Sequence, residues 1–81
     1  MVRYYGFCGT VARKVDQNAK EFYRGNGKWE EDDRMSLNLN DAMMDYGDWS
    51  PSDYDDLTEE QAMEWIKKVD ELGKYYGPNS Y

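Results

Sequence analysis

Residues 57–73 read LTEEQAMEWIKKVDELG and decide the fold, because they carry a full set of signals for one amphipathic helix. Thr58 followed three residues later by Gln61 forms a capping box, in which each side chain accepts a hydrogen bond from the other residue's backbone N–H. Acids fill the first turn, lysines follow, and Gly73 stands where a helix commonly ends. The apolar face consists of Ala62, Trp65, Ile66, Val69 and Leu72. We therefore predict a helix over residues 59–72.

Three shorter segments precede this helix. Residues 41–46 predict a short helix, opened by Asn40 and stopped by Gly47. Residues 50–53 (Ser-Pro-Ser-Asp) predict a single helical turn with proline at its first position. Over residues 35–39, Met and Leu alternate with Ser and Asn, and this alternation predicts a short strand.

The first 31 residues predict an antiparallel meander. The expected strands are residues 1–8, 11–15, 19–24 and 28–31. Residues 25–27 (Gly-Asn-Gly) form a strong turn signal, and residues 16–18 suit another turn. The glycine pairs Gly6/Gly9 and Gly25/Gly27 are interpreted as turn or bulge positions, since neither matches a phosphate-binding loop.

A rival reading of the same half is a helix over residues 10–24, stopped by Gly25. Its apolar face would consist of Val11, Val15, Ala19 and Phe22. We favour strands because Tyr, Phe, Thr and Val dominate this stretch. The expected fold class is α+β: a small antiparallel meander sheet of three to four strands, packed by a C-terminal helix and a short helix, in a single domain over residues 1–81.

The composition predicts a small soluble domain with an aromatic-rich core. Only eleven residues are Leu, Ile, Val or Phe, and the net charge is −7, a combination typical of disorder. Eight Tyr, three Trp and five Met supply the missing apolar area. No apolar run approaches the roughly 18 residues of a membrane span, and the N-terminus lacks the apolar centre of a secretory signal. We therefore expect a cytoplasmic protein that does not bind membranes.

The residues needed for catalysis are scarce. The chain has no histidine, which removes the commonest general base and metal ligand. Cys8, the single cysteine, lies in a predicted strand and is interpreted as a small core residue. The carboxylates occur in runs typical of solvated surfaces, and a calcium-loop template from Asp48 fails because Asp53 takes the required glycine position. We predict no enzyme activity, no catalytic or metal-binding residue and no cofactor.

Charge is distributed unevenly along the chain. Residues 30–66 hold thirteen acids and one base, a net charge of −12, whereas residues 1–29 have a net charge of +4. Acids at helix starts account for part of this block, but not for the near absence of bases. Such a surface attracts basic partners in the same way as duplex phosphates do, and it disfavours direct nucleic-acid binding. The predicted partner-binding residues are Glu30, Glu31, Asp32, Asp33, Asp45, Asp48, Trp49, Asp53, Tyr54, Asp55, Asp56, Glu59 and Glu60.

The aromatics Tyr46, Trp49 and Tyr54 lie among these acids. In one interpretation they are core residues of a leucine-poor protein. In the other they are exposed, and they stack on arginines of a partner or fill its apolar pockets. Both readings remain open at this point.

In layout the chain resembles small acidic proteins encoded by phages and mobile elements, among them anti-CRISPR proteins and related inhibitors that mimic nucleic acids. The resemblance covers the Tyr-rich opening strand, the hairpin into residues 28–33, the acidic middle and the closing helix from residues 58–62. It implies a non-catalytic inhibitor that occupies the nucleic-acid-binding site of a basic partner protein or complex. The host cytoplasm would be its location if a phage encodes it.

An alternative is a structural or accessory interaction module that assembles through an apolar surface, for example as a homodimer. Its candidate residues are Met43, Met44, Met63, Tyr75 and Tyr76. Loose binding of divalent cations by the dense acids is a third hypothesis. Salt separates the first two, because only binding through charges weakens steeply with ionic strength.

Overall fold

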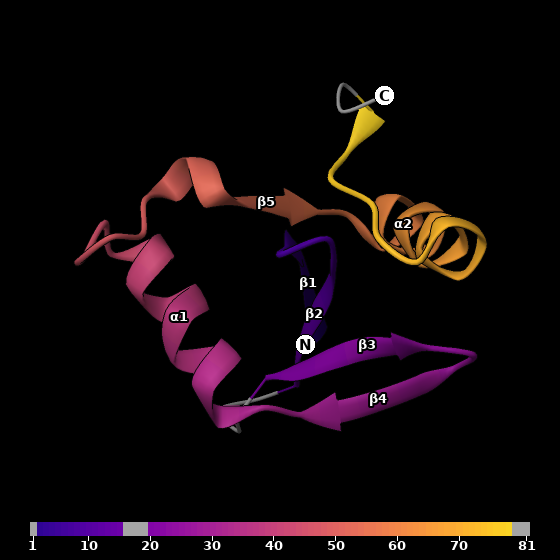
Figure 1. Cartoon of the computed structure of the whole chain (residues 1–81), viewed down its shortest axis with the longest axis horizontal. Helices are drawn as coiled ribbons and strands as arrows, with labels where there is room; N and C mark the ends of the chain where they lie inside the picture. The colour runs from indigo at the N-terminus through magenta and orange to yellow at the C-terminus, as the bar shows by residue number, and fades with distance from the viewer. Residues whose placement is uncertain (1, 16–19, 79–81) are drawn as a thin grey trace.

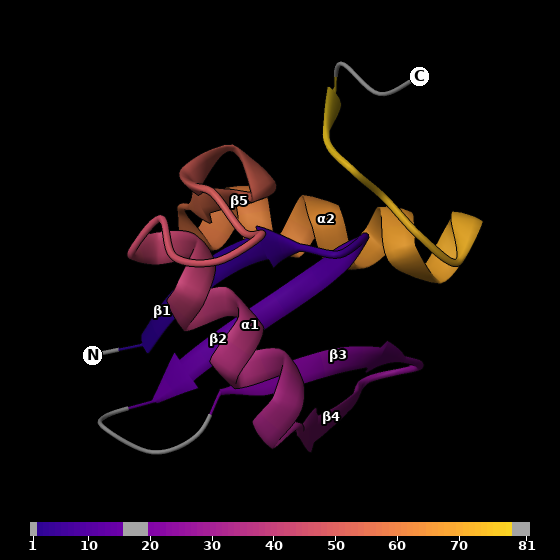
Figure 2. The same cartoon turned by 60° about the vertical axis from the view of Figure 1, so that its left-hand side comes forward.

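A computed structural model describes residues 2–15 and 20–78, and it places a five-stranded sheet between two helices (Figures 1 and 2). The strands are β1 (Val2–Phe7), β2 (Thr10–Val15), β3 (Glu21–Gly25), β4 (Lys28–Glu31) and β5 (Tyr54–Leu57). The helical segments are α1 (Asp33–Met43), the single turn η1 (Pro51–Asp53) and α2 (Glu59–Leu72). The α+β prediction is confirmed, and the sheet is wider than predicted.

All strand pairs are antiparallel, and the strands lie in the order β4-β3-β2-β1-β5. The predicted meander is confirmed in β1 to β4, and the rival helix over residues 10–24 does not form because β2 and β3 occupy that stretch. The turn predicted at residues 16–18 and the strand start at Ala19 lie outside the described residues. After β4 the chain crosses one face of the sheet as α1 and returns at the opposite edge as β5.

Each face of the sheet carries its own small core. Successive side chains of a strand point to opposite faces, and Tyr5 lies opposite Ala12, which in turn lies opposite Phe22. The core on the α1 side consists of Tyr5, Phe7, Ala12, Phe22, Leu39 and Ala42. The core on the α2 side consists of Val11, Tyr23, Ala62, Trp65, Val69 and Tyr75. Because two thin layers must be filled, large aromatic side chains replace the usual leucines.

The strand predicted at residues 35–39 and the bounds of the helix predicted at residues 41–46 are wrong. Asp32 accepts a hydrogen bond from the backbone N–H of Met35 at 2.9 Å and so starts α1 eight residues early. Leu39 packs into the core while Leu37 is 61% exposed, as a helical period requires. Of residues 41–46 only the first three are helical.

The predicted bounds and capping box of the C-terminal helix are confirmed. Gln61 N–H donates to Thr58 Oγ1 at 3.1 Å, and Thr58 N–H donates to Gln61 Oε1 at 2.9 Å. The helix ends at Gly73, whose φ of +85° suits glycine. Leu72 was assigned to the apolar face but is exposed. The predicted turn η1 also forms, with proline at its start.

Gly6 is the position where a side chain is least tolerated. It lies within β1 rather than at the predicted turn or bulge, and a Cβ there would collide with the ring of Trp65. Gly9, Gly25 and Gly27 do have positive φ angles, as turns require. The bare backbone of Gly6 therefore lets α2 approach the sheet beside β5.

Candidate interaction surface

The structure divides the predicted partner-binding acids between two opposite edges of the sheet. Glu30 and Glu31 lie on β4, while Asp55 and Asp56 lie on β5 (Figure 1). These edge strands are separated by four strand spacings of about 4.8 Å, roughly 19 Å in total. The acidic residues that form one block in the sequence therefore lie on two separate surfaces of the folded protein.

The acids at the β4 edge, which we call the β4 acidic group, are Glu30, Glu31, Asp32 and Asp33. Arg24 contacts two of them, with Nη2 at 2.8 Å from Asp32 Oδ2 and Nε at 3.4 Å from Glu30 Oε2. The Met35 N–H holds the pKa of Asp32 below its usual value, and Arg24 adds to this shift. Part of this group therefore has a structural role: Asp32 caps the start of α1, and the contacts with Arg24 stabilise the β3–β4 hairpin.

A second group, which we call the β5 acidic surface, is formed by Asp53, Asp55, Asp56, Glu59, Glu60 and Glu64. All six residues are exposed. Among the described residues, the ion pairs are Arg13–Glu21, Arg24–Glu30, Arg24–Asp32 and Lys68–Glu71, so none involves this surface. Asp53 has a local partner, because its carboxylate accepts the Ser50 N–H at 2.8 Å.

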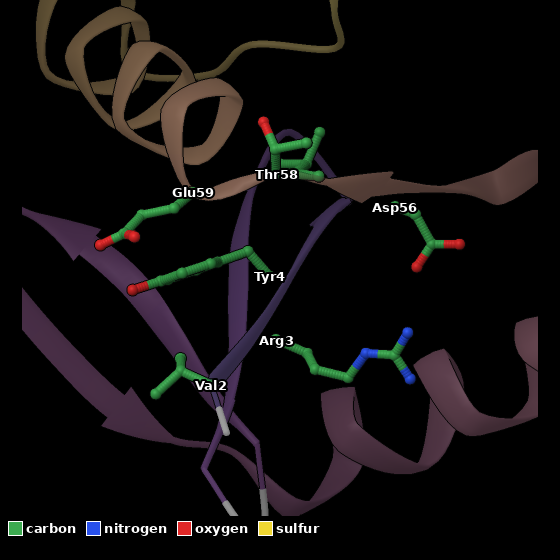
Figure 3. Close-up of a pocket in the computed structure, with 7 residues that line it drawn as sticks. Val2, Arg3, Tyr4, Asp56, Thr58 and Glu59 are labelled. Atoms are coloured by element: carbon green, nitrogen blue, oxygen red, sulfur yellow. The ribbon is translucent and has the colours of Figure 1, made fainter.

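A hollow of about 720 Å³ lies where β1, β5 and the start of α2 meet (Figure 3). Figure 3 shows Arg3 and Asp56 on the side that faces α1, and Tyr4 and Glu59 on the other side. Arg3 and Asp56 both act on Tyr5, whose pKa is raised mainly by burial; Arg3 lowers it and Asp56 raises it. This hollow therefore mixes charges of both signs.

The remaining predicted residues lie in the segment between α1 and β5. Asp45 and Asp48 are both exposed there, and Asp45 has a φ of +54°. Trp49 packs against Phe7 with ring centroids 5.1 Å apart, and Tyr54 packs against Tyr5 at 6.0 Å. These two aromatics thus follow the core reading.

Tyr46 differs from the other two aromatics, since it is 65% exposed.

Two residues beside β5, Glu64 and Tyr76, are not among the partner-binding residues predicted from the sequence. The spacing of Glu64, four residues after Glu60 in a predicted helix, could have placed it there. Tyr76 follows the helix in an irregular segment, and no periodicity in the sequence signals its position.

Cys8 is not the small core residue that was predicted. It occupies the turn between β1 and β2 with a φ of +51°, and it is exposed. Desolvation raises the pKa of its thiol, and the Asp53 carboxylate raises it further. Both effects disfavour the reactive thiolate.

The apolar residues of the alternative hypothesis do not form one patch. Met43 packs against the α1-side core and Tyr75 is buried against Trp65, whereas Met44, Met63 and Tyr76 are exposed. Met44 ends α1 and Met63 lies on α2, and these helices cover opposite faces of the sheet.

Within the described part of the chain, no group of three or more acids or cysteines is placed to hold a metal ion. No helix in that part is both long and apolar enough to cross a bilayer. No family model, curated protein or solved structure matches the chain.

Proposed function

We propose that this protein is a non-catalytic binding protein whose β5 acidic surface occupies the nucleic-acid-binding site of a basic partner, as an anti-CRISPR-like nucleic-acid mimic would. One observation carries the proposal. Six exposed carboxylates gather along β5 and the start of α2, and none is in an ion pair with a described lysine or arginine. Their charge is therefore available to a partner.

Density and placement support this role. Duplex nucleic acid carries one negative charge per roughly 1.7 Å of helix axis. Asp53 ends the turn η1, Asp55 and Asp56 lie on β5, and Glu59 and Glu60 follow at the N-terminus of α2. A groove that binds phosphates would be drawn to such a field, and the attraction would weaken as salt screens it.

Competition with nucleic acid tests the proposal. The protein is immobilised, host proteins are captured at low salt, and increasing salt elutes them for mass spectrometry. The captured partner is then challenged with its own nucleic acid. We expect nucleic acid to displace the protein, and we expect elution at moderate salt. Capture that survives high salt, or that nucleic acid does not reduce, would contradict the proposal.

Paired charge reversals locate the surface. Asp55→Lys with Asp56→Lys changes the β5 edge, and Glu30→Lys with Glu31→Lys makes the same change of charge at the β4 edge. We expect the first pair to weaken partner binding at least about tenfold and the second by less than about threefold. Equal losses would show that net charge alone, and not the β5 acidic surface, determines binding.

A second candidate function is assembly of an accessory module as a homodimer. Leu37 lies on α1, Met44 directly follows the helix, and Tyr46 lies in the loop after it; all three are more than half exposed. Sedimentation at high salt tests this candidate, because an apolar dimer persists there. Replacing Met44 with Gln would then dissociate it.

A further inference from the structure

Two hollows adjoin along β5, and Trp65 of α2 lines both of them. One measures about 340 Å³ and the other about 280 Å³, and both are lined by Asp55, Trp65 and Tyr76. Glu64 and the strand residue Asp56 also line the larger hollow, and Asp53 lines the smaller one. The Asp56 side chain points to the side of β5 that faces α1 (Figure 3). We call their sum the β5 groove. Among the described residues that line the two hollows there is no lysine or arginine, although the chain contains ten.

The aromatic walls of the β5 groove are held in place by the fold. Trp65 is only 6% exposed, lies over the bare backbone of Gly6 and packs edge-on against Tyr75 with ring centroids 5.1 Å apart. The Tyr75 N–H donates to the Gly9 carbonyl at 2.9 Å, which ties the segment after α2 to the β1–β2 turn. Little side-chain freedom remains to be lost at Trp65 when a ligand binds.

Tyr76 supplies the accessible ring. A Cβ built on Gly9 would come within 3.0 Å of Tyr76 Cζ, so the ring rests against the turn, yet 54% of the residue stays exposed. A half-exposed aromatic ring between carboxylates suits a planar cation. Arginine fits better than lysine, because its guanidinium stacks on aromatic faces and donates paired hydrogen bonds to a carboxylate.

We propose that the β5 groove binds arginine side chains of the partner protein, with Asp55 accepting their hydrogen bonds and Tyr76 stacking on them. This inference rests on the function proposed above and names the chemical group that the same edge recognises. It is argued from the complementarity between a guanidinium group and a groove that has aromatic walls and whose described charged residues are all acidic. The Cys8 thiol, which also lines the smaller hollow, takes no part.

A defined peptide tests the inference without knowledge of the partner. The probe is an eight-residue peptide of alternating arginine and serine, titrated into isotope-labelled protein by NMR and measured by calorimetry. Two further peptides carry lysine, or uncharged citrulline, in place of arginine. We expect the arginine peptide to shift the amides of Asp55 and Tyr76 and the indole N–H of Trp65. We expect severalfold weaker binding with lysine and at least about tenfold weaker binding with citrulline.

Three single variants complete the test. Asp55→Asn removes the shared carboxylate, and Tyr76→Leu removes the aromatic face while it keeps an apolar cover over Gly9. Glu31→Gln makes the same change of charge on the opposite edge and serves as the matched control. We expect the first two to weaken the arginine peptide by at least about fivefold and the control by less than about twofold. The dispersion of the NMR spectrum shows that each variant is folded.

Several outcomes would overturn the inference. Equal losses in Asp55→Asn and Glu31→Gln would show that only overall charge attracts the peptide. Equal affinities of the arginine and lysine peptides, together with no effect of Tyr76→Leu, would exclude stacking. If these variants leave competition between the partner and nucleic acid intact, the groove is not the binding site although the proposed function stands. If the peptide binds as expected but nucleic acid never competes, the proposed function fails and the groove stands.

Discussion

The two edges of the sheet hold themselves together by different means. At the β4 edge, ion pairs add to aromatic packing. Arg24 bridges Glu30 and Asp32, and Arg13 pairs with Glu21 and lies 4.1 Å from the centroid of the Trp29 ring. The Trp29 ring in turn packs against Tyr23. At the β5 edge, apolar packing holds the structure together, through Trp65 over Gly6 and through Trp49 and Tyr54 on the α1 side. The described carboxylates of the β5 edge form no ion pair, and we therefore expect Asp55 and Asp56 to contribute little to the free energy of unfolding.

This difference separates acids that stabilise the fold from acids that are available for binding. In sequence the two kinds form one block, and charge counting alone cannot tell them apart. In the structure a cation or a backbone N–H lies beside Glu30, Asp32 and Asp53. No described cation pairs with Asp55 or Asp56. Removal of contacts at each edge should therefore have opposite consequences for stability and for binding.

The largest expected effect on stability comes from Gly6→Ala. The added methyl group would meet the Trp65 ring, and overpacking of this kind costs about 1–3 kcal/mol. Urea denaturation measures the loss. Gly6→Ala should lower the free energy of unfolding by less in a Trp65→Leu background than in the wild type, because the smaller side chain removes the clash. Strictly additive effects would show that Gly6 and Trp65 do not press on one another.

The next effect concerns the polar clamp on the β3–β4 hairpin. Asp70 of α2 accepts the Tyr23 hydroxyl at 2.8 Å and the Asn26 N–H at 3.1 Å, and the Tyr23 oxygen accepts the Gly27 N–H at 2.9 Å. We expect Asp70→Asn to lower the free energy of unfolding by about 1–2 kcal/mol. Thermal and urea denaturation measure it.

The neighbouring Glu71→Gln is the matched control for that clamp. Glu71 forms only an exposed ion pair with Lys68 at 3.8 Å, and its loss should cost less than about 0.5 kcal/mol. If Asp70→Asn is no more damaging than this control, the hairpin does not depend on α2.

Local signals were sufficient for most of the fold. The capping box at Thr58 and the apolar positions after it predict α2 to the residue, and the Gly25–Gly27 turn predicts the β3–β4 hairpin. The failure at α1 also has a local cause. Met35 and Leu39 satisfy both a strand period and a helix period. Asp32, whose cap marks the start of the helix, is one of four consecutive acids and so does not stand out as a capping residue in the sequence.

The candidate site could be predicted only in part, because its separation into two surfaces depends on topology. That Glu31 and Asp55 lie on opposite edges follows from the return of the chain through α1, which no residue near them signals. The contribution of Tyr76 depends on the long-range contact with Gly9. Trp49 could not be assigned, since an aromatic among acids suits a core and an interface equally well.

A smaller effect tests the role of Asp32 through pH. Its pKa in the folded state lies below its usual value, so its contribution to stability is present above the usual value and is lost as the pH falls through the folded-state value. Asp32→Asn keeps a capping oxygen but cannot titrate. We expect the melting temperature of the variant to be lower than that of the wild type at neutral pH, and we expect the gap to close in strong acid. A gap independent of pH would contradict this assignment.

The smallest expected effect is the sharpest test of the contrast between the edges. Asp55→Asn with Asp56→Asn removes two exposed carboxylates from the β5 edge, where no described cation pairs with them. Because like charges repel within this surface, neutralising them should leave stability unchanged or raise it by no more than about 0.5 kcal/mol at low salt. Any gain should disappear at high salt, where the repulsion is already screened.

Urea denaturation at the two salt concentrations measures this effect, with Glu30→Gln as the comparison at the β4 edge. Glu30 loses its contact with Arg24, so its neutralisation should be neutral or slightly destabilising. A clear loss of stability in the β5 variant would mean that Asp55 and Asp56 hold the fold after all, and the β5 edge would then resemble the β4 edge. Unchanged or higher stability, together with weaker partner binding, is what a surface kept for a partner requires.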